Sequence, residues 1–266
     1  MEQLITEAAK LAENGVKELI LVAQETTLYG VDLYGKKSLP ELLTKLSAID
    51  GIKWIRILYA YPEEITDELI DTIAKLDKVC NYIDMPIQHA SDNILKKMGR
   101  LTSKSDIENI VERLRSKIPD IAIRTTLITG FPTETEADHE TMMQFVNDCE
   151  FDRLGVFTYS LEEDTAAANF EEQIDEEIKA ERRNAVMELQ QEIVFERNEK
   201  MTGRELDVFI EGKLPEDNIY VGRTYMDAPG VDGLIFVKSP YELISGDIVK
   251  TKVTGASEYD LIGETV

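Results

Sequence analysis

Cysteine and histidine are scarce in this chain, whose 266 residues include only two of each. Cys80 and Cys149 lie far apart within patterned segments, which excludes a disulfide framework and a cysteine-rich zinc site and is typical of a reducing compartment. His89 and His139 share no metal-ligand spacing. The sequence therefore predicts no metal site formed by its own residues.

Long hydrophobic runs are also absent from the sequence. No apolar run reaches the roughly 18 residues that a membrane span needs, and no signal peptide precedes Glu2. Hydrophobic residues still make up 43% of the chain, which supports a sizeable core in one large domain and a smaller one. We therefore expect a cytoplasmic protein that makes no membrane contact.

Basic residues are outnumbered, because 29 lysines and arginines face 52 aspartates and glutamates, for a net charge of −23. Such a surface repels phosphate backbones, which makes nucleic acid an improbable direct partner. The same charge suits a basic protein partner.

Strand and helix patterns alternate five times along residues 1–160. The expected helices run over Glu2–Glu13, from a Ser38–Glu41 capping box to about Ile49, from Thr66 to about Leu76, from a Ser103–Asp106 capping box to Lys117, and from Thr135 to about Cys149. The expected strands are Leu19–Ala23, Trp54–Tyr59, Tyr82–Met85, a strand that starts near Ile121 and ends in Gly130-Phe-Pro132, and Leu154–Tyr159. Such alternation predicts an α/β fold with a parallel sheet and right-handed crossovers, either a partial TIM-type barrel or a flavodoxin-like open sheet.

Polar residues follow each expected strand, at the end where α/β barrels place their ligand contacts. The stretch from Tyr82 to Arg100 is the first candidate, because Gln88 and Ser91 lie between a strand and a helix. Ser91 alone could be a simple helix N-cap, whereas an amide at Gln88 caps nothing. The strand ends together predict one ligand site on one rim.

The last third of the sequence changes character twice. Asp175 to Lys200 is strongly helical, and we expect a solvated helix on the barrel whose apolar stripe is formed by Ile178, Ala185, Leu189 and Ile193. Short β runs follow, separated by Gly, Pro, Asp and Asn, as in a small OB-like barrel. With seven basic and twelve acidic residues from Lys200 to Val266, this barrel is better suited to a protein than to nucleic acid.

Several segments, in the right order, resemble the radical S-adenosylmethionine methylthiotransferases over almost the whole chain. These segments are QHASDNILKKMGR, IRTTLITGFPTETE, VFTYSLEEDTAAA, GRTYMDAPGVDGLIFV and YDLIGE. The resemblance implies a partial radical-enzyme barrel with its linking helix over residues 1–199 and a TRAM domain over 200–266. LYAYPEEITDELI is more similar to the branch that modifies small-subunit ribosomal protein S-twelve than to the MiaB-like branch that modifies tRNA.

The activity implied by this resemblance is the insertion of a methylthio group into an aspartate side chain of ribosomal protein S-twelve. S-adenosylmethionine and reduced four-iron–four-sulfur clusters are the implied cofactors. By position, Gln24, Glu25 and Thr26 are expected to face the methionine part of S-adenosylmethionine, and Gln88 and Ser91 its ribose.

Three further site residues carry alternatives of their own. Arg124 is expected to pair with the cofactor carboxylate, or else with a neighbouring carboxylate inside the barrel. The turn at Gly130 and Pro132 either lets the backbone approach the adenine or is a plain turn. No catalytic residue is assigned.

The sequence departs from the family at its metal-binding part. It contains neither the CxxxCxxC loop that holds the radical cluster nor the three-cysteine domain that holds the second, and Cys80 and Cys149 are expected to be packing residues. We expect Met1 to be an internal start, the first barrel strand to lie upstream, and the chain alone to be unable to cleave S-adenosylmethionine. Thr133 stands where the family's turn usually carries glycine, so its Cβ is expected to tighten or displace the cofactor loop. A tRNA methylthiotransferase and a non-catalytic binding module remain alternatives.

Overall fold

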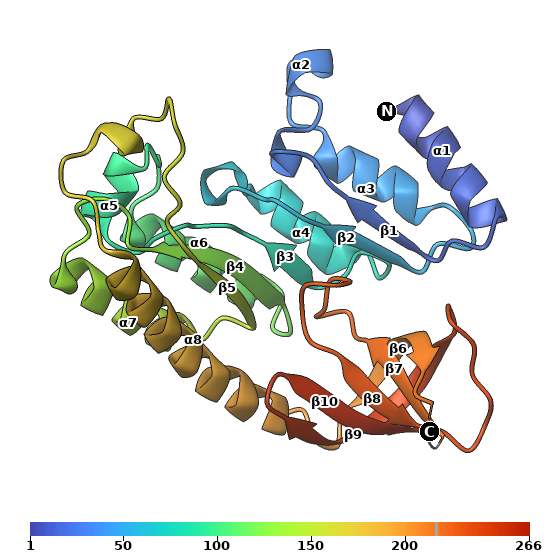
Figure 1. Ribbon diagram of the computed structural model, residues 1–266. Helices are drawn as coiled ribbons and strands as arrows, with labels where there is room; N and C mark the ends of the chain where they lie inside the picture. The colour runs from blue at the N-terminus through green and yellow to red at the C-terminus, as the bar shows by residue number, and fades with distance from the viewer. Residues whose placement is uncertain (216–217) are drawn as a thin grey trace.

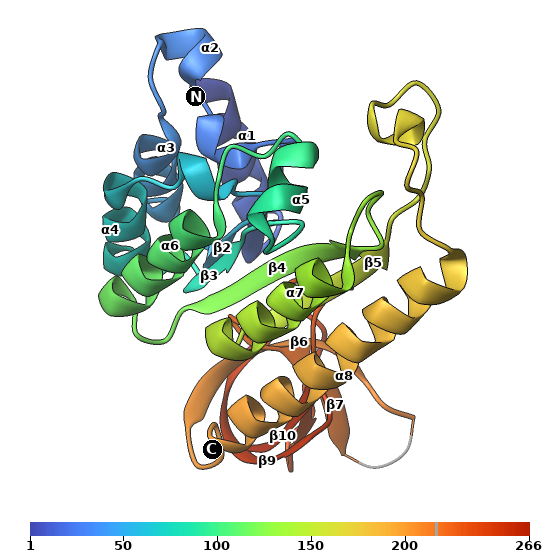
Figure 2. The ribbon, with the colours of Figure 1, turned by 90° about the vertical axis from the view of Figure 1, so that its left-hand side faces the viewer.

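The computed structural model describes residues 1–215 and 218–266 and consists of an arc of parallel strands, an outer layer of helices and a second, all-β barrel (Figure 1). Figure 2 shows the helices on the outer side of the arc and the β barrel below it. The α-helices are α1 (Glu2–Glu13), α2 (Val31–Tyr34), α3 (Leu39–Ser47), α4 (Asp67–Lys75), α5 (Asp92–Lys97), α6 (Lys104–Lys117), α7 (Glu136–Cys149) and α8 (Glu176–Glu199). Short 3-10 turns are η1 (Thr26–Leu28), η2 (Pro62–Glu64) and η3 (Ala167–Asn169).

The parallel strands follow one another in space in their chain order. They are β1 (Glu18–Leu21), β2 (Trp54–Ile57), β3 (Tyr82–Asp84), β4 (Ala122–Thr129) and β5 (Arg153–Thr158). β1 pairs with β2, and β3 with β4 and β5, while a bridge between Ile55 and Val79 connects the two sets. This sequential order excludes the flavodoxin-like alternative, in which the first two strands exchange places. The partial TIM-type barrel is therefore confirmed.

The outer layer of the arc is a continuous apolar core. Outward side chains of the strands, such as Ile55, Ile83 and Ile123, are fully buried against the helices. Each such isoleucine contributes about 1.5–3 kcal/mol to folding. The helices are consequently fixed on one side of the sheet, and the concave side is left for other contacts.

Helix capping agrees with the sequence at one of the two predicted boxes, and the structure adds a further box that was not predicted. Ser103 with Asp106 and Thr135 with Asp138 form complete capping boxes at α6 and α7. The Ser38–Glu41 box is wrong, because the Ser38 hydroxyl donates to the Lys36 carbonyl rather than accepting from the helix. α3 nevertheless begins directly after Ser38, since its leucines are buried in the core.

The stripe expected on α8 is wrong in part. Ile178 is 40% exposed, while Ile193 is buried as expected. Between them the inward face carries polar side chains, Lys179, Arg182 and Gln190, all less than 10% exposed. These groups reach backbone carbonyls or carboxylates of the parallel barrel, so hydrogen bonds and ion pairs hold much of this helix in place.

The second barrel closes in the order β10-β8-β7-β6-β9. Its strands are β6 (Glu205–Lys213), β7 (Ile219–Arg223), β8 (Ile235–Lys238), β9 (Ile248–Ser257) and β10 (Asp260–Thr265). The small barrel expected from the sequence is therefore confirmed. Its apolar core is continuous with Trp54, Cys80 and Tyr82 of the parallel barrel, so it covers the amino ends of the parallel strands.

Within the described part of the chain, no helix combines the length and the apolar character needed to cross a membrane.

Candidate active site

A cavity of about 760 Å³ lies at the carboxyl ends of β4 and β5, which is a volume suited to a nucleoside-sized ligand. The inner face of β4 forms its floor, and α5 and the segment after β5 form its sides. Its walls include Gln88, Lys97, Met98, Arg100, Thr126, Ile128, Phe131, Phe157, Tyr159, Ser160 and Thr165.

Strand alternation decides which side chains reach this cavity. In β4 the residues at positions 123, 125, 127 and 129 are buried against the helices, whereas Thr126 and Ile128 are half-buried and line the cavity. Phe157 is paired with Ile128 in register on β5 and also lines it. The cavity therefore opens on the concave side of the arc.

Gln88 lies in the cavity wall with an unusual backbone. Its φ of 73° is in the left-handed region, and its N–H donates to the Thr126 carbonyl while its own carbonyl accepts from the Ile128 N–H. The corner after β3 is thus bound to β4 at both sides of Gln88. This arrangement presents the amide of Gln88 beside two cavity residues, in the place expected from the sequence.

Ser91 is turned away from the cavity. It occupies the N-cap position of α5 but makes no capping hydrogen bond, and its buried hydroxyl donates to Asp138 of α7. Burial acts to raise the pKa of Asp138, but the hydrogen bonds from Ser91 and Thr135 outweigh it and hold that pKa below its ordinary value. Ser91 is therefore neither a hydrogen-bonding N-cap nor part of the cavity wall. Its hydroxyl instead fastens the loop between β3 and α5 to α7.

Gln24, Glu25 and Thr26 follow β1 outside the cavity wall, and the last two of them tie strand ends together. Gln24 is exposed, whereas the Thr26 hydroxyl donates to the Leu58 carbonyl at 2.6 Å. Glu25 accepts from the N–H groups of Thr27 at 2.9 Å and Tyr61 at 3.0 Å. Burial raises the pKa of Glu25 despite these hydrogen bonds. Only Gln24 of the three presents a free side chain to the rim.

The turn after β4 is built around a buried carboxylate. Glu134 accepts from the N–H groups of Gly130 and Phe131 at 2.7 and 3.2 Å. Gly130 has φ of 70°, and a Cβ there would lie 2.1 Å from Cγ of Lys179, so α8 occupies the space that glycine leaves. Pro132 is buried. The cavity wall at this turn is Phe131, whose ring meets that of Tyr159 edge-on at 5.3 Å.

Glu134 also joins two other elements of the site. Oε1 of Glu134 pairs with Arg182 of α8 at 3.0 Å. His89 Nε2 lies 3.5 Å from Oε2, the oxygen that accepts from the turn. Sequence reasoning did not single out Glu134, Arg182 or Phe131, whereas Tyr159 and Ser160 end an expected strand at the rim and do line the cavity. A glutamate two residues after a Gly-Phe-Pro sequence was the available signal, because such a turn leaves backbone N–H groups that need an acceptor.

Thr133 has φ of 73°, a left-handed conformation that favours glycine. Its hydroxyl accepts from Lys97 of the cavity wall at 2.5 Å. The position where the sequence departs from the family is thus one where the backbone carries strain.

Arg124 lies away from the rim, in the amino-terminal half of β4. Its guanidinium pairs with Asp84 at 2.8 Å and with Asp232 of the second barrel at 3.1 Å. The expected pairing with a cofactor carboxylate is therefore replaced by the internal ion pair that was its alternative. Tyr82 completes this group by donating to Asp232 at 2.8 Å.

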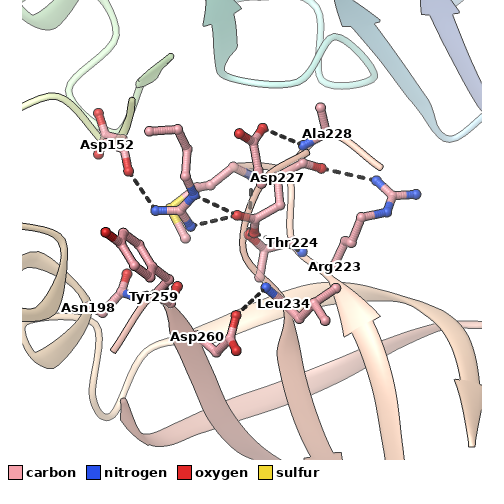
Figure 3. A network of polar contacts seen from close by, with 12 residues as sticks. Asp152, Asn198, Arg223, Thr224, Asp227, Ala228, Leu234, Tyr259 and Asp260 are labelled. Atoms are coloured by element: carbon pink, nitrogen blue, oxygen red, sulfur yellow. Dashed lines mark hydrogen bonds and ion pairs between the residues drawn. The ribbon is translucent and has the colours of Figure 1, made fainter. Parts of the chain in front are cut away.

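A larger buried network continues from this group between the two barrels (Figure 3). Asp227 pairs with Arg153 of β5 at 2.6 Å, and Arg223 pairs with Glu18 of β1 at 2.7 Å. Figure 3 shows Asp227 and Arg223 on the segment that faces the parallel strands. These pairs fasten the second barrel to the amino ends of the parallel strands, on the side opposite the cavity.

Comparisons with known proteins agree with both parts of this architecture. The profile of the Radical SAM superfamily matches residues 1–146, and that of the TRAM domain matches residues 202–266. The chain is 62% identical over 263 residues to ribosomal protein uS12 methylthiotransferase RimO of Lachnoclostridium phytofermentans, covering 99% of this chain and 60% of that protein. It is 53% identical over 265 residues to the RimO of Clostridioides difficile, covering 100% of this chain and 60% of that protein. The chain thus spans about 60% of the length of the curated relatives it matches.

Among solved structures, coproporphyrinogen III oxidase (HemN) of Escherichia coli is similar in fold. The TM-score is 0.50 at 16% identity, covering 76% of this chain and 47% of that one.

Proposed function

The chain belongs to the Radical SAM superfamily, and we propose that it is the barrel and TRAM part of a ribosomal protein uS12 methylthiotransferase of the RimO type. The observation that carries the proposal is identity of 62% that extends through both barrels. In this proposal the complete enzyme adds a methylthio group to an aspartate of uS12, in the cytoplasm.

We propose that the cavity binds the adenosyl part of S-adenosylmethionine, because its volume and walls fit such a group. Phe131 and Ile128 offer apolar contacts for a purine, and Gln88 and Ser160 offer hydrogen-bond partners for ribose hydroxyls. The exposed Gln24 remains the candidate for the methionine part. When bound beside a reduced iron–sulfur cluster, this cofactor supplies the radical chemistry. The chain's own residues bind and orient it and exclude water from one side.

The cysteines of this chain do not fit an iron–sulfur cluster. Cys80 lies in the core shared with the second barrel, whereas Cys149 lies in the outer core. Burial raises the pKa of Cys80 to about 11 and that of Cys149 to about 12, so neither forms a thiolate at neutral pH. Anaerobic reconstitution of the chain with iron and sulfide should therefore give no stoichiometric four-iron cluster, as measured by iron content and visible absorbance.

The partner is tested by titrating the chain with purified uS12 and, separately, with bulk tRNA at moderate and high salt. Salt-sensitive binding to uS12 is expected, because the chain carries −23 net charge and ribosomal proteins are basic. Binding to tRNA in preference to uS12 would instead assign the chain to the tRNA-modifying branch. Binding to neither would contradict the assignment of substrate recognition to this part of the enzyme.

A further inference from the structure

Tyr59 adopts a backbone conformation that a bulky side chain rarely takes. It follows β2 at the carboxyl rim and has φ of 57°, in the left-handed region. Gln88 and Thr133 have the same property after β3 and β4. Such conformations cost folding free energy and persist only where the surrounding structure imposes them, and they concentrate at functional sites.

Neighbouring strands impose the conformation of Tyr59. Its N–H donates to Oδ2 of Asp84 at 3.2 Å, and its carbonyl accepts from the Thr26 N–H at 3.0 Å. The next N–H, of Ala60, donates to the Asp84 carbonyl at 2.8 Å. The other carboxylate oxygen of Asp84 is held by Arg124. The position of Tyr59 is thus fixed by η1 and β3 and by the ion pair between Asp84 and Arg124.

The side chain presented in this way is not used for internal packing. Tyr59 is 45% exposed, and its hydroxyl makes no hydrogen bond to any of the described residues. Val22 after β1 and Phe157 of β5 are also large apolar side chains at the carboxyl rim, 61% and 60% exposed. Large apolar side chains left exposed at the carboxyl rim offer contacts to a partner, and tyrosine is enriched in protein-binding surfaces.

We propose that Tyr59 is a specificity-determining residue that contacts the protein substrate as it enters the barrel mouth. This inference rests on the proposed function. The occupant is a segment of the basic ribosomal protein, because an aromatic ring can pack on its peptide groups and attract its lysine and arginine side chains, and the acidic chain favours that charge.

The test measures uS12 affinity and melting temperature for the full chain and for the variants Tyr59→Phe, Tyr59→Asn and Tyr59→Gly. Asparagine and glycine both tolerate a left-handed φ, so either variant keeps the backbone while it removes the ring. Glu258→Gly is the matched control, because Glu258 has φ of 50° in an exposed position beyond β9. This control variant measures the effect of relieving backbone strain without removing an aromatic ring.

We expect Tyr59→Asn and Tyr59→Gly to weaken uS12 binding about tenfold, with melting temperatures within about 3 °C of the unsubstituted chain. Tyr59→Phe should bind within about twofold, and Glu258→Gly should bind normally. Unchanged affinity in the asparagine and glycine variants would overturn the role of Tyr59 and leave the proposed function intact. Failure of the unsubstituted chain to bind uS12 would overturn the partner and this inference together.

Discussion

Replacing Gly130 by alanine tests how closely the turn after β4 is packed against α8. The added Cβ would lie 2.1 Å from Cγ and 2.9 Å from Cβ of Lys179, which are atoms near the helix backbone rather than the flexible end of the side chain. Lys179 also donates to the Tyr159 carbonyl at 3.1 Å, so displacing it disturbs the cavity wall. The substitution therefore combines a steric clash with a left-handed φ of 70°.

The magnitude follows from these two costs. A left-handed conformation costs an alanine about 1–2 kcal/mol relative to glycine. Forcing extra volume into a packed site costs about 1–3 kcal/mol. We expect Gly130→Ala to lower the free energy of unfolding by about 2–5 kcal/mol. Gly99→Ala is the control, because Gly99 has φ of 74° with nothing within 4 Å of an added Cβ, so only the first cost applies.

Urea unfolding measures the loss of unfolding free energy in both variants, provided that the dependence of this free energy on urea concentration is the same as in the unsubstituted chain. The double variant Gly130→Ala with Lys179→Ala separates the costs, because it removes the Cγ and Cδ atoms and should recover most of the steric part. Equal losses for Gly130→Ala and Gly99→Ala would refute the packing argument. Lack of any recovery in the double variant would show that Lys179 is not the obstacle.

Three further predictions concern strain, buried charge and the thiols. Thr133→Gly should raise the melting temperature by about 2–4 °C in a thermal scan, because φ of 73° strains threonine. Asp227→Ala should cost about 3–5 kcal/mol in urea unfolding, since it leaves its arginine partner buried and unpaired, whereas Asp207→Ala in an exposed pair should cost under about 1 kcal/mol. Cys80 and Cys149 should resist thiol reagents at pH 8 until the chain unfolds. Because burial raises both folded-state thiol pKa values above the ordinary 9.0, unfolding releases protons above that pH, and stability measured by urea unfolding should fall between pH 9 and about 12.

The sequence was sufficient to predict the strands, the longer helices and their layering, but not the short α2 or the 3-10 turns. Buried parallel strands are nearly continuous apolar runs, and amphipathic helices between them repeat with the helical period, so both appear in the pattern itself. The capping box at Ser103 was confirmed because it depends only on residues three positions apart in the sequence. The one at Ser38 was wrong because burial of the α3 leucines, a tertiary effect, fixes where that helix begins.

The inward face of α8 shows where pattern reasoning fails. The helical period alone predicts apolar residues on the inward face of the helix. Lys179, Arg182 and Gln190 lie there instead, because carbonyl and carboxylate oxygens of other elements accept their hydrogen bonds. Those acceptors are separated from the helix by up to 48 residues in the case of Arg182 and Glu134. No local pattern in the sequence contains that pairing.

For the site, the strand-end rule located Gln88 and the turn after β4, because it depends only on strand direction. The same rule could not predict the direction of the Ser91 side chain, because its hydroxyl donates to Asp138, 47 residues later in the chain. It also missed Phe131, which the sequence shows within the turn but whose direction is set by the packing of Gly130 against α8. The sequence therefore predicts which residues lie at the carboxyl rim, but it does not predict the direction in which each side chain points.

Arg124 shows how the second barrel decides which charges remain available to a ligand. It lies five positions before Thr129 on β4, which at about 3.3 Å per residue is roughly 16 Å from the rim. At that depth its charge needs partners within the protein, and Asp232, 108 residues later, supplies one across the interface. Asp227 and Glu18 do the same for Arg153 and Arg223. These three arginines are therefore neutralised within the protein at the amino end, and their ion pairs leave none of them available to a ligand at the carboxyl rim.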